Sequence, residues 1–207
     1  AEIKNIYGLV EGSQEELETI QKYLVPSKSK LLLWDDANEN NIKNINLNNF
    51  KIIHFATHGE LAGTIKGQNE PFLVLTPPKI GTNENDGLLT MSEIMNLENN
   101  AELVILSACN TAGGNIKQSE GFSGLARAFL FSGSKSVLVS NWYVETYAAM
   151  ELTTGMMKLI KDNPKISTSK ALSGSMKNFI KNNNKKSHPF YWAPFVIVGL
   201  NSNINLN

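Results

Sequence analysis

The sequence predicts a three-layer α/β sandwich on a mostly parallel sheet, formed by one domain that spans residues 1–207. Two observations carry this prediction. Segments of strand length alternate with segments of helical periodicity along most of the chain. The two most apolar strand segments, 51–57 and 103–107, are apolar on both faces, which is typical of parallel strands that helices cover on both sides.

The composition fits a globular domain with a sizeable core, because hydrophobic residues make up 42% of the 207 residues and charged residues 18%. Lys plus Arg and Asp plus Glu both number 19, and this zero net charge argues against direct nucleic-acid or membrane partners. The sequence opens with no signal segment and contains no spanning apolar run, so we expect a cytoplasmic protein. The chain begins at Ala1 without a methionine, so we expect a domain from a longer protein.

The first quarter of the chain predicts two strands, each followed by a helix. Residues 5–10 form the first predicted strand, and Ser13 caps the next helix, with Glu16 completing a capping box. Residues 30–34 form the second predicted strand, and the apolar residues of 42–45 have a weak helical spacing. The chain therefore opens in the order β-α-β-α.

The rest of the chain continues this alternation around one looser region. The third strand, 51–57, is followed by an isolated short strand at 72–75 among turn-forming prolines and glycines. Thr90 caps a short helix that precedes the buried strand 103–107. The remaining elements are helices at 120–133, 145–161 and 169–181 and strands at 136–140 and 195–199, with Gly133 ending the first of these helices.

Two reactive side chains follow the two most apolar strands, namely His58 and Cys109, the one cysteine of the chain. Ligands of open parallel sheets bind outside the carboxyl ends of the strands, so these side chains face one another if the strands are neighbours. A thiol with a pKa of about 8.5 needs a basic partner to react near neutral pH, and an imidazole can also protonate a leaving amine. The N–H groups of Gly59 and Cys109 are candidate donors to an oxyanion. From these residues alone, Cys109 is either a buried small hydrophobe or a reactive thiol.

Metal and nucleotide sites are disfavoured, so the sequence predicts no metal and no cofactor. His54 and His58 lie roughly 13 Å apart on a continuous strand at about 3.3 Å per residue, which is too far to share a metal ion. His54 is therefore expected to pack on its strand, and His188 is expected to be solvated in a polar loop. The glycines after Cys109 lack the Lys-Ser/Thr pair that a phosphate-binding loop needs.

Four blocks of the sequence resemble the CHAT domain, a caspase-like cysteine peptidase module related to caspases and separase. The blocks are "IIHFATHGEL" (52–61), "LVILSACNTAGG" (103–114), "SEGFSGLARAFLFSGSKSVLVSNWYV" (119–144) and "HPFYWAPFVIVGL" (188–200). The resemblance implies a caspase fold in which His58 is the general base and acid and Cys109 is the nucleophile. It also implies an oxyanion hole formed by the amides of Gly59 and Cys109.

One block departs from the family pattern, in which Trp-Pro-Val-Asp-Asp stands where this chain has Trp-Tyr-Val-Glu-Thr at 142–146. In separase-like relatives the second acidic position helps to bind a basic side chain before the scissile bond. That position is Thr146 here, with Glu145 beside it. We therefore expect a small polar or apolar specificity pocket, and its candidate substrate-binding residues are Ser107, Ser140, Trp142, Glu145 and Thr146.

The resemblance implies a cysteine endopeptidase that cleaves one or a few protein partners through a thioester intermediate. It also implies that the domain is the C-terminal part of a longer chain, behind a regulatory repeat or sensor region. The loops 62–70, 111–119 and 182–188 are candidate regulatory surfaces. The family includes members linked to CRISPR immunity, to gasdermin-like pore formers and to developmental control, which puts bacterial defence among the expected contexts. The alternative is a catalytically silent interaction module that only docks a partner.

Overall fold

The computed structural model describes residue 3 and residues 6–82, 84–107 and 119–206. Its central sheet has four strands in the order β1-β5-β6-β7. Strands β1, β5 and β6 run parallel, and β7 pairs antiparallel with β6 along the far edge. Their bounds are Ile52–Phe55 for β1, Leu103–Leu106 for β5, Ser136–Ser140 for β6 and Phe195–Gly199 for β7. The mostly parallel sheet is therefore confirmed.

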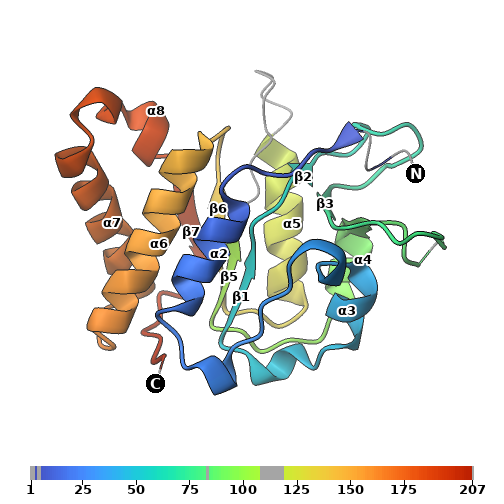
Figure 1. Ribbon diagram of the computed structural model, residues 1–207, viewed down its shortest axis with the longest axis horizontal. Coiled ribbons are helices and arrows are strands. Elements are labelled where there is room, and N and C mark those ends of the chain that lie inside the picture. The colour runs from blue at the N-terminus through green and yellow to red at the C-terminus, as the bar shows by residue number, and fades with distance from the viewer. Residues whose placement is uncertain (1–2, 4–5, 83, 108–118, 207) are drawn as a thin grey trace.

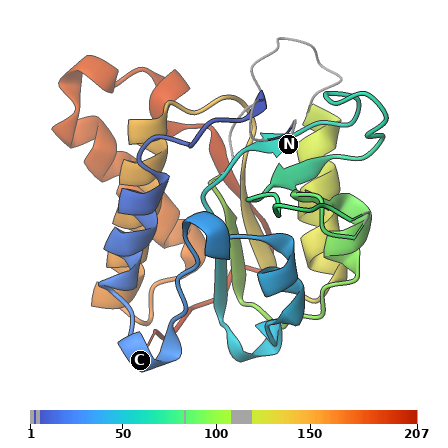
Figure 2. The same cartoon turned by 45° about the vertical axis from the view of Figure 1, so that its right-hand side comes forward.

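Helices cover both faces of this sheet, so the molecule has three layers (Figures 1 and 2). Helices α2 (Ser13–Gln21), α6 (Thr146–Asp162) and α7 (Thr168–Asn182) cover one face. Helices α4 (Met91–Met95) and α5 (Ser119–Phe131) lie on the other face. The two faces bury separate apolar clusters, because alternate residues of each strand point to opposite sides. Ile105 packs with Leu152 and Met156 in one cluster, and Val104 packs with Leu125 and Phe129 in the other.

A second, antiparallel sheet lies beside the first and contains the strands β2, β3 and β4 in that order. These strands span Gly59–Glu60, Phe72–Val74 and Leu88–Thr90. The small sheet is anchored in the core, because Leu73 and Leu89 are fully buried with the α5 cluster. The chain leaves β1 and enters β2 within a few residues, and His58 lies in this connection.

Short elements connect these layers. They are α3 (Glu39–Asn44), α8 (Pro189–Trp192) and the 3₁₀ segments Pro26–Lys28, Trp34–Asp36, Leu47–Asn49 and Asn184–Lys186. Thr90 caps α4 as predicted, and Glu93 completes its capping box. In the described ranges, no helix combines the length and the apolar character needed to cross a membrane.

Two predicted strands are wrong. Residues 7–10 have no regular secondary structure, and residues 29–33 run without strand pairing into the 3₁₀ turn at Trp34–Asp36. A strand needs a neighbour that supplies backbone donors and acceptors, and in the described structure β1 pairs with β5 alone. An apolar run of strand length does not reveal whether such a neighbour exists.

The predicted start of α2 is also corrected. Gly12, with φ of 78°, occupies the N-cap position and supplies no side-chain hydrogen bond. Ser13 is the first helical residue, and Glu16 is buried instead of closing a capping box. Glu16 lies four residues before Ile20 and therefore shares the buried stripe of the helix with it.

Gly133, which follows α5, offers a test of the turn that leads into β6. Its φ is 116°, and a Cβ atom built there would lie 2.0 Å from the Asn99 carbonyl oxygen. We expect Gly133→Ala to lower the free energy of unfolding by about 3 kcal/mol, through backbone strain and this clash. Chemical denaturation measures the change. Gly81→Ala is the control, because the nearest atom to its Cβ would be 3.7 Å away, and an equal loss there would contradict the explanation.

Candidate active site

The chain segments that lead to His58 and to Cys109 leave the central sheet side by side. Phe55, the last residue of β1, is in parallel register with Leu106, the last residue of β5. The Ser107 N–H then donates to the Phe55 carbonyl at 2.9 Å, which extends the pairing one residue beyond the strand. The two strands are therefore neighbours, as the predicted pairing of His58 with Cys109 requires. Cys109 itself lies outside the described residues.

His58 is held by the segment that precedes α2. Its Nε2 atom lies 2.9 Å from the carbonyl oxygen of Gly8, and its ring packs against Tyr7 with the ring centroids 5.5 Å apart. A carbonyl oxygen can only accept a hydrogen bond, so Nε2 carries a proton. In the neutral imidazole, Nδ1 is then the unprotonated nitrogen. The backbone of Gly8 thus sets which nitrogen of His58 can act as a base.

Gly59 directs its N–H away from β3, the strand that pairs with β2. The Val74 N–H donates to the His58 carbonyl at 2.8 Å, so residues 58 and 74 form a hydrogen-bonded pair of the β2–β3 ladder. Gly59 and Leu73 are the next pair. Hydrogen-bonded and non-hydrogen-bonded pairs alternate in an antiparallel ladder, so Gly59 and Leu73 form a non-hydrogen-bonded pair. The N–H of Gly59 therefore points away from β3, and β2 is an end strand of its sheet.

A buried polar cluster, which we call the Glu16 cluster, lies between α2 and the sheet and consists of Glu16, His54, Ser107 and Thr153. Glu16 accepts hydrogen bonds from Ser107 Oγ at 3.1 Å and from Thr153 Oγ1 at 2.7 Å. His54 Nε2 lies 3.0 Å from Glu16 Oε1, although this approach lacks the direction of a hydrogen bond. His54 lies on its strand, as expected, but its ring contacts the Glu16 carboxylate and not only apolar side chains.

The sequence interpretation missed three parts of this region: Gly8, Tyr7 and Glu16. The backbone carbonyl of Gly8 has no sequence signature, and residues 5–10 resembled a strand. For Glu16 a signal exists, since its spacing of four residues from Ile20 places it on the apolar stripe of α2.

Comparison with known proteins identifies the chain. The CHAT domain family matches residues 4–200, which is nearly the whole sequence. The chain belongs to the CHAT domain family. CHAT is a caspase-like domain related to cysteine peptidases, and the mixed α/β architecture with its mostly parallel sheet agrees with that fold.

Two curated relatives of this CHAT domain carry the same name in different species. Tetratricopeptide repeat protein 28 of Mus musculus is 27% identical over 182 residues, and the protein of that name in Homo sapiens is 26% identical over 182 residues. Each match covers 75% of this chain and 7% of the relative. The CHAT domain therefore spans only a small part of the length of these relatives.

The five candidate substrate-binding residues lie in different surroundings. Ser107 is buried in the Glu16 cluster, and the indole N–H of Trp142 donates to the Phe190 carbonyl at 3.0 Å. Thr146 directs its methyl group toward Gly12, where a Cβ atom would lie 3.5 Å from it. Glu145 accepts from the Ala148 N–H at 3.2 Å and so caps α6. Ser140, the fifth, is buried at the carboxyl end of β6.

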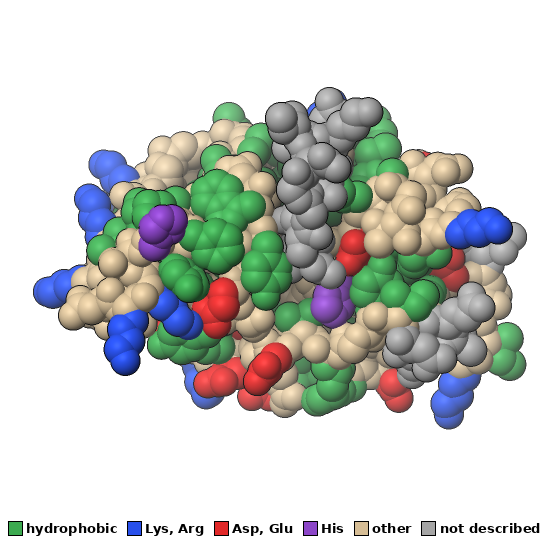
Figure 3. All heavy atoms as spheres, turned by 90° about the horizontal axis from the view of Figure 1, so that it is seen from above, with side chains coloured by type: hydrophobic (Ala, Val, Ile, Leu, Met, Phe, Trp, Pro, Cys, Tyr) green, Lys and Arg blue, Asp and Glu red, His purple; other side chains and the backbone are tan. Residues whose placement is uncertain are grey.

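The charge of Glu145 is matched by a neighbouring lysine. Lys186 Nζ lies 2.9 Å from Glu145 Oε2, and the Glu145 side chain is 36% exposed. The same ammonium group lies 4.7 Å from the centre of the Tyr147 ring. Figure 3 shows hydrophobic side chains gathered over α6 and α8 on this side of the molecule, where Tyr147 and Phe190 are exposed. The surroundings of Glu145 are thus aromatic and close to neutral.

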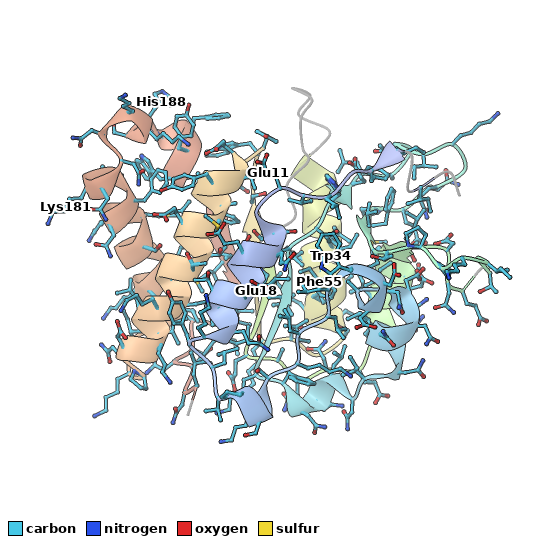
Figure 4. The ribbon with its side chains drawn as sticks, viewed as in Figure 1. Glu11, Glu18, Trp34, Phe55, Lys181 and His188 are labelled. Atoms are coloured by element: carbon cyan, nitrogen blue, oxygen red, sulfur yellow. The ribbon has the colours of Figure 1, made fainter. Side chains whose placement is uncertain are left out.

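The remaining sequence predictions concern His188, the candidate regulatory loops and metal ions. His188 is exposed as predicted, and its Nδ1 accepts from the Phe190 N–H, which caps α8. Figure 4 shows it at the end of the molecule that carries α7 and Lys181, away from Glu11 in the segment before α2. Of the three candidate regulatory loops, 111–119 lies almost wholly outside the described residues. In the parts of the chain that are described, no three His, Cys, Asp or Glu residues gather in a group that could hold a metal ion.

Tyr7 offers a test of how the segment before α2 packs on the CHAT domain. Burial and the negative charge of Glu60 raise the pKa of the Tyr7 phenol above its usual value of 10.0. The folded protein then holds this proton more tightly than the unfolded chain, so the wild type loses stability as the pH rises above 10.0. Unfolding experiments with Tyr7→Phe are expected to show a weaker loss over that range.

At neutral pH the same variant reports on an unpartnered hydroxyl. Within the described structure the buried Tyr7 hydroxyl has no hydrogen-bond partner. Removing it is therefore expected to leave stability unchanged or to raise it by up to about 1 kcal/mol. Tyr143→Phe is the control, because Tyr143 is exposed. A Tyr7→Phe protein that is less stable than wild type at neutral pH would show that the hydroxyl has a partner.

Proposed function

We propose that this CHAT domain is a cysteine endopeptidase in which His58 and Cys109 form the catalytic dyad. The observation that carries the proposal is the hydrogen bond from His58 Nε2 to the Gly8 carbonyl at 2.9 Å. It orients the ring and leaves Nδ1 as the basic nitrogen, which is what a general base beside a thiol needs. The adjacent ends of β1 and β5 support a short separation between the two side chains.

The proposed reaction has two steps with a shared oxyanion site. His58 Nδ1 takes the proton of the Cys109 thiol, and the thiolate attacks the scissile carbonyl carbon. The resulting oxyanion accepts hydrogen bonds from the N–H groups of Gly59 and Cys109. It collapses to a thioester as His58 gives its proton to the leaving amine. Water, deprotonated by His58, then hydrolyses the thioester and restores the thiol.

Thiol alkylation tests the dyad without knowledge of the natural substrate. We expect iodoacetamide to modify Cys109 faster than a free thiol at pH 7, because His58 increases the thiolate fraction. His58→Ala is expected to lower the alkylation rate constant by about tenfold, because a free thiol is only a few per cent thiolate at this pH. Mass spectrometry of the modified peptide measures the rate.

Two controls make the alkylation result specific. Cys109→Ala removes the site of modification, and His188→Ala changes a histidine that caps α8 away from the proposed site. Alkylation of wild-type Cys109 at the rate of a free thiol, with no effect of His58→Ala, would contradict the peptidase and favour the interaction module.

We further propose a small polar or apolar specificity pocket around Ser107, Ser140, Trp142 and Thr146. The ion pair between Glu145 and Lys186 supports it, because that carboxylate is already matched in charge and also caps α6. A cationic substrate side chain would have to compete with Lys186 for Glu145. A neutral side chain has no such competitor, so the pocket favours neutral residues before the scissile bond.

A peptide library measures this preference directly. We expect cleavage after small polar or apolar residues, with cleavage after Arg or Lys slower by about tenfold, the penalty for about 1.4 kcal/mol of lost binding. Lys186→Met frees the Glu145 carboxylate and is expected to improve cleavage after Arg. Lys181→Met is the control, because Lys181 lies on α7 and carries a similar charge. A dominant requirement for Arg in the wild type would overturn the neutral pocket.

The partner that this function implies is a protein substrate, cut at one or a few sites. We propose that a repeat region regulates the peptidase, either in the same protein or as an associated chain. The curated relatives named tetratricopeptide repeat protein 28 support this, since the matched part makes up only 7% of their length. The contact between Gly8 and His58 is a physical route for such regulation, because residues before α2 touch the proposed base.

A further inference from the structure

We propose that Glu16 is a positioning residue for the dyad, an inference that rests on the proposed peptidase function. Glu16 does not touch a reacting atom. Its buried carboxylate instead joins the three elements whose ends carry the parts of the site.

The Glu16 carboxylate is deeply buried, with only 3% of the residue exposed. Burying a carboxylate is unfavourable unless hydrogen bonds and charges compensate for the lost water. Here Oε2 accepts from Ser107, Oε1 accepts from Thr153, and His54 Nε2 approaches to 3.0 Å. The carboxylate is therefore fixed at both oxygens.

Two of these contacts, and the helix that carries Glu16, lead to different parts of the site. His54 lies on β1, four residues before His58. Ser107 follows β5 and lies two residues before Cys109 in the sequence. Glu16 itself belongs to the first turn of α2, and the chain just before this helix supplies the Gly8 carbonyl to His58. One carboxylate thus connects three segments. They are β1, which leads to the base, the end of β5, which leads to the nucleophile, and α2, which follows the carbonyl that orients the base.

The third contact, with Thr153, differs from the other two and provides an internal comparison. Thr153 lies in the middle of α6, which carries neither the base nor the nucleophile. Its hydroxyl also approaches the Ala149 carbonyl at 3.0 Å. Loss of the Thr153 hydroxyl is therefore expected to affect the packing of α6 more than the geometry of the dyad.

The central experiment compares Glu16→Gln with Glu39→Gln. Glu39 is also buried, and it accepts from the Gly87 N–H and pairs with Lys43 at 2.8 Å, away from His58. We expect Glu16→Gln to lower the alkylation rate constant of Cys109 by about threefold to tenfold, because a displaced His58 increases the thiolate fraction less. We also expect its alkylation to need a higher pH. Glu39→Gln is expected to leave both quantities at the wild-type value.

Two variants within the Glu16 cluster locate the effect. Ser107→Ala breaks the link to the chain that leads to Cys109 and is expected to reproduce part of the loss. Thr153→Val breaks the link to α6 and is expected to keep the wild-type rate and pH profile. Ser107→Ala also keeps the proposal testable if Glu16→Gln does not fold. Equal rates for Ser107→Ala and the wild type would then overturn it.

A spectroscopic measurement separates this proposal from the proposed function. NMR of ¹⁵N-labelled histidine reports the tautomer of His58, and the bond to Gly8 predicts the Nε2-protonated form in the wild type. We expect Glu16→Gln to mix the two tautomers, and an unchanged tautomer together with an unchanged alkylation rate would overturn the positioning role. Slow alkylation of the wild type would instead overturn the peptidase, and the tautomer would still decide the role of Glu16.

Discussion

The parallel pairing of β1 with β5 is the constraint on which the rest of the structure depends. Its register places Phe55 beside Leu106, so both strands end at the same height and their chains leave the sheet together. Helices cover both faces of the paired strands and exclude water from them. The two separate apolar clusters fix which side chains point to each face. A shift of one residue along either strand would exchange the faces and place His54 among the apolar side chains that pack against α5.

The site is completed by segments that lie far from the sheet in sequence. The stretch before α2 crosses the carboxyl ends of the strands and brings a backbone carbonyl to His58. Glu16, in α2 itself, accepts a hydrogen bond from Ser107 and so attaches the helix to the end of β5. Beside them, Lys186 and Glu145 join the segment before α8 to the start of α6. The CHAT domain thus combines a rigid pair of strands with contacts from the regions 7–16 and 186–190. Changes in either region can reach the proposed chemistry without altering the sheet.

The sequence predicts the elements whose signal is local, and it fails where tertiary contacts decide. Continuous apolar runs correctly located β1, β5, β6 and β7, and the capping box at Thr90 correctly located α4. Residues 5–10 and 30–34 have the same apolar character but lack a pairing neighbour, which no local pattern reveals. Glu16 satisfied the capping-box spacing and a buried-stripe spacing at once, and packing selected the second. The adjacent ends of β1 and β5 followed from the apolar strand pattern, whereas the Gly8 carbonyl beside His58 did not.

The acceptor that orients His58 is a main-chain atom, and this affects how the site can be mapped. Every residue type has a carbonyl group, so replacing the side chain at position 8 leaves the acceptor in place. Alanine scanning would therefore pass over one of the contacts nearest to the proposed base. Methods that alter the backbone itself, such as an amide-to-ester exchange or stepwise shortening of the chain toward α2, would detect it. The importance of this segment can thus be hidden from any approach that compares side chains alone.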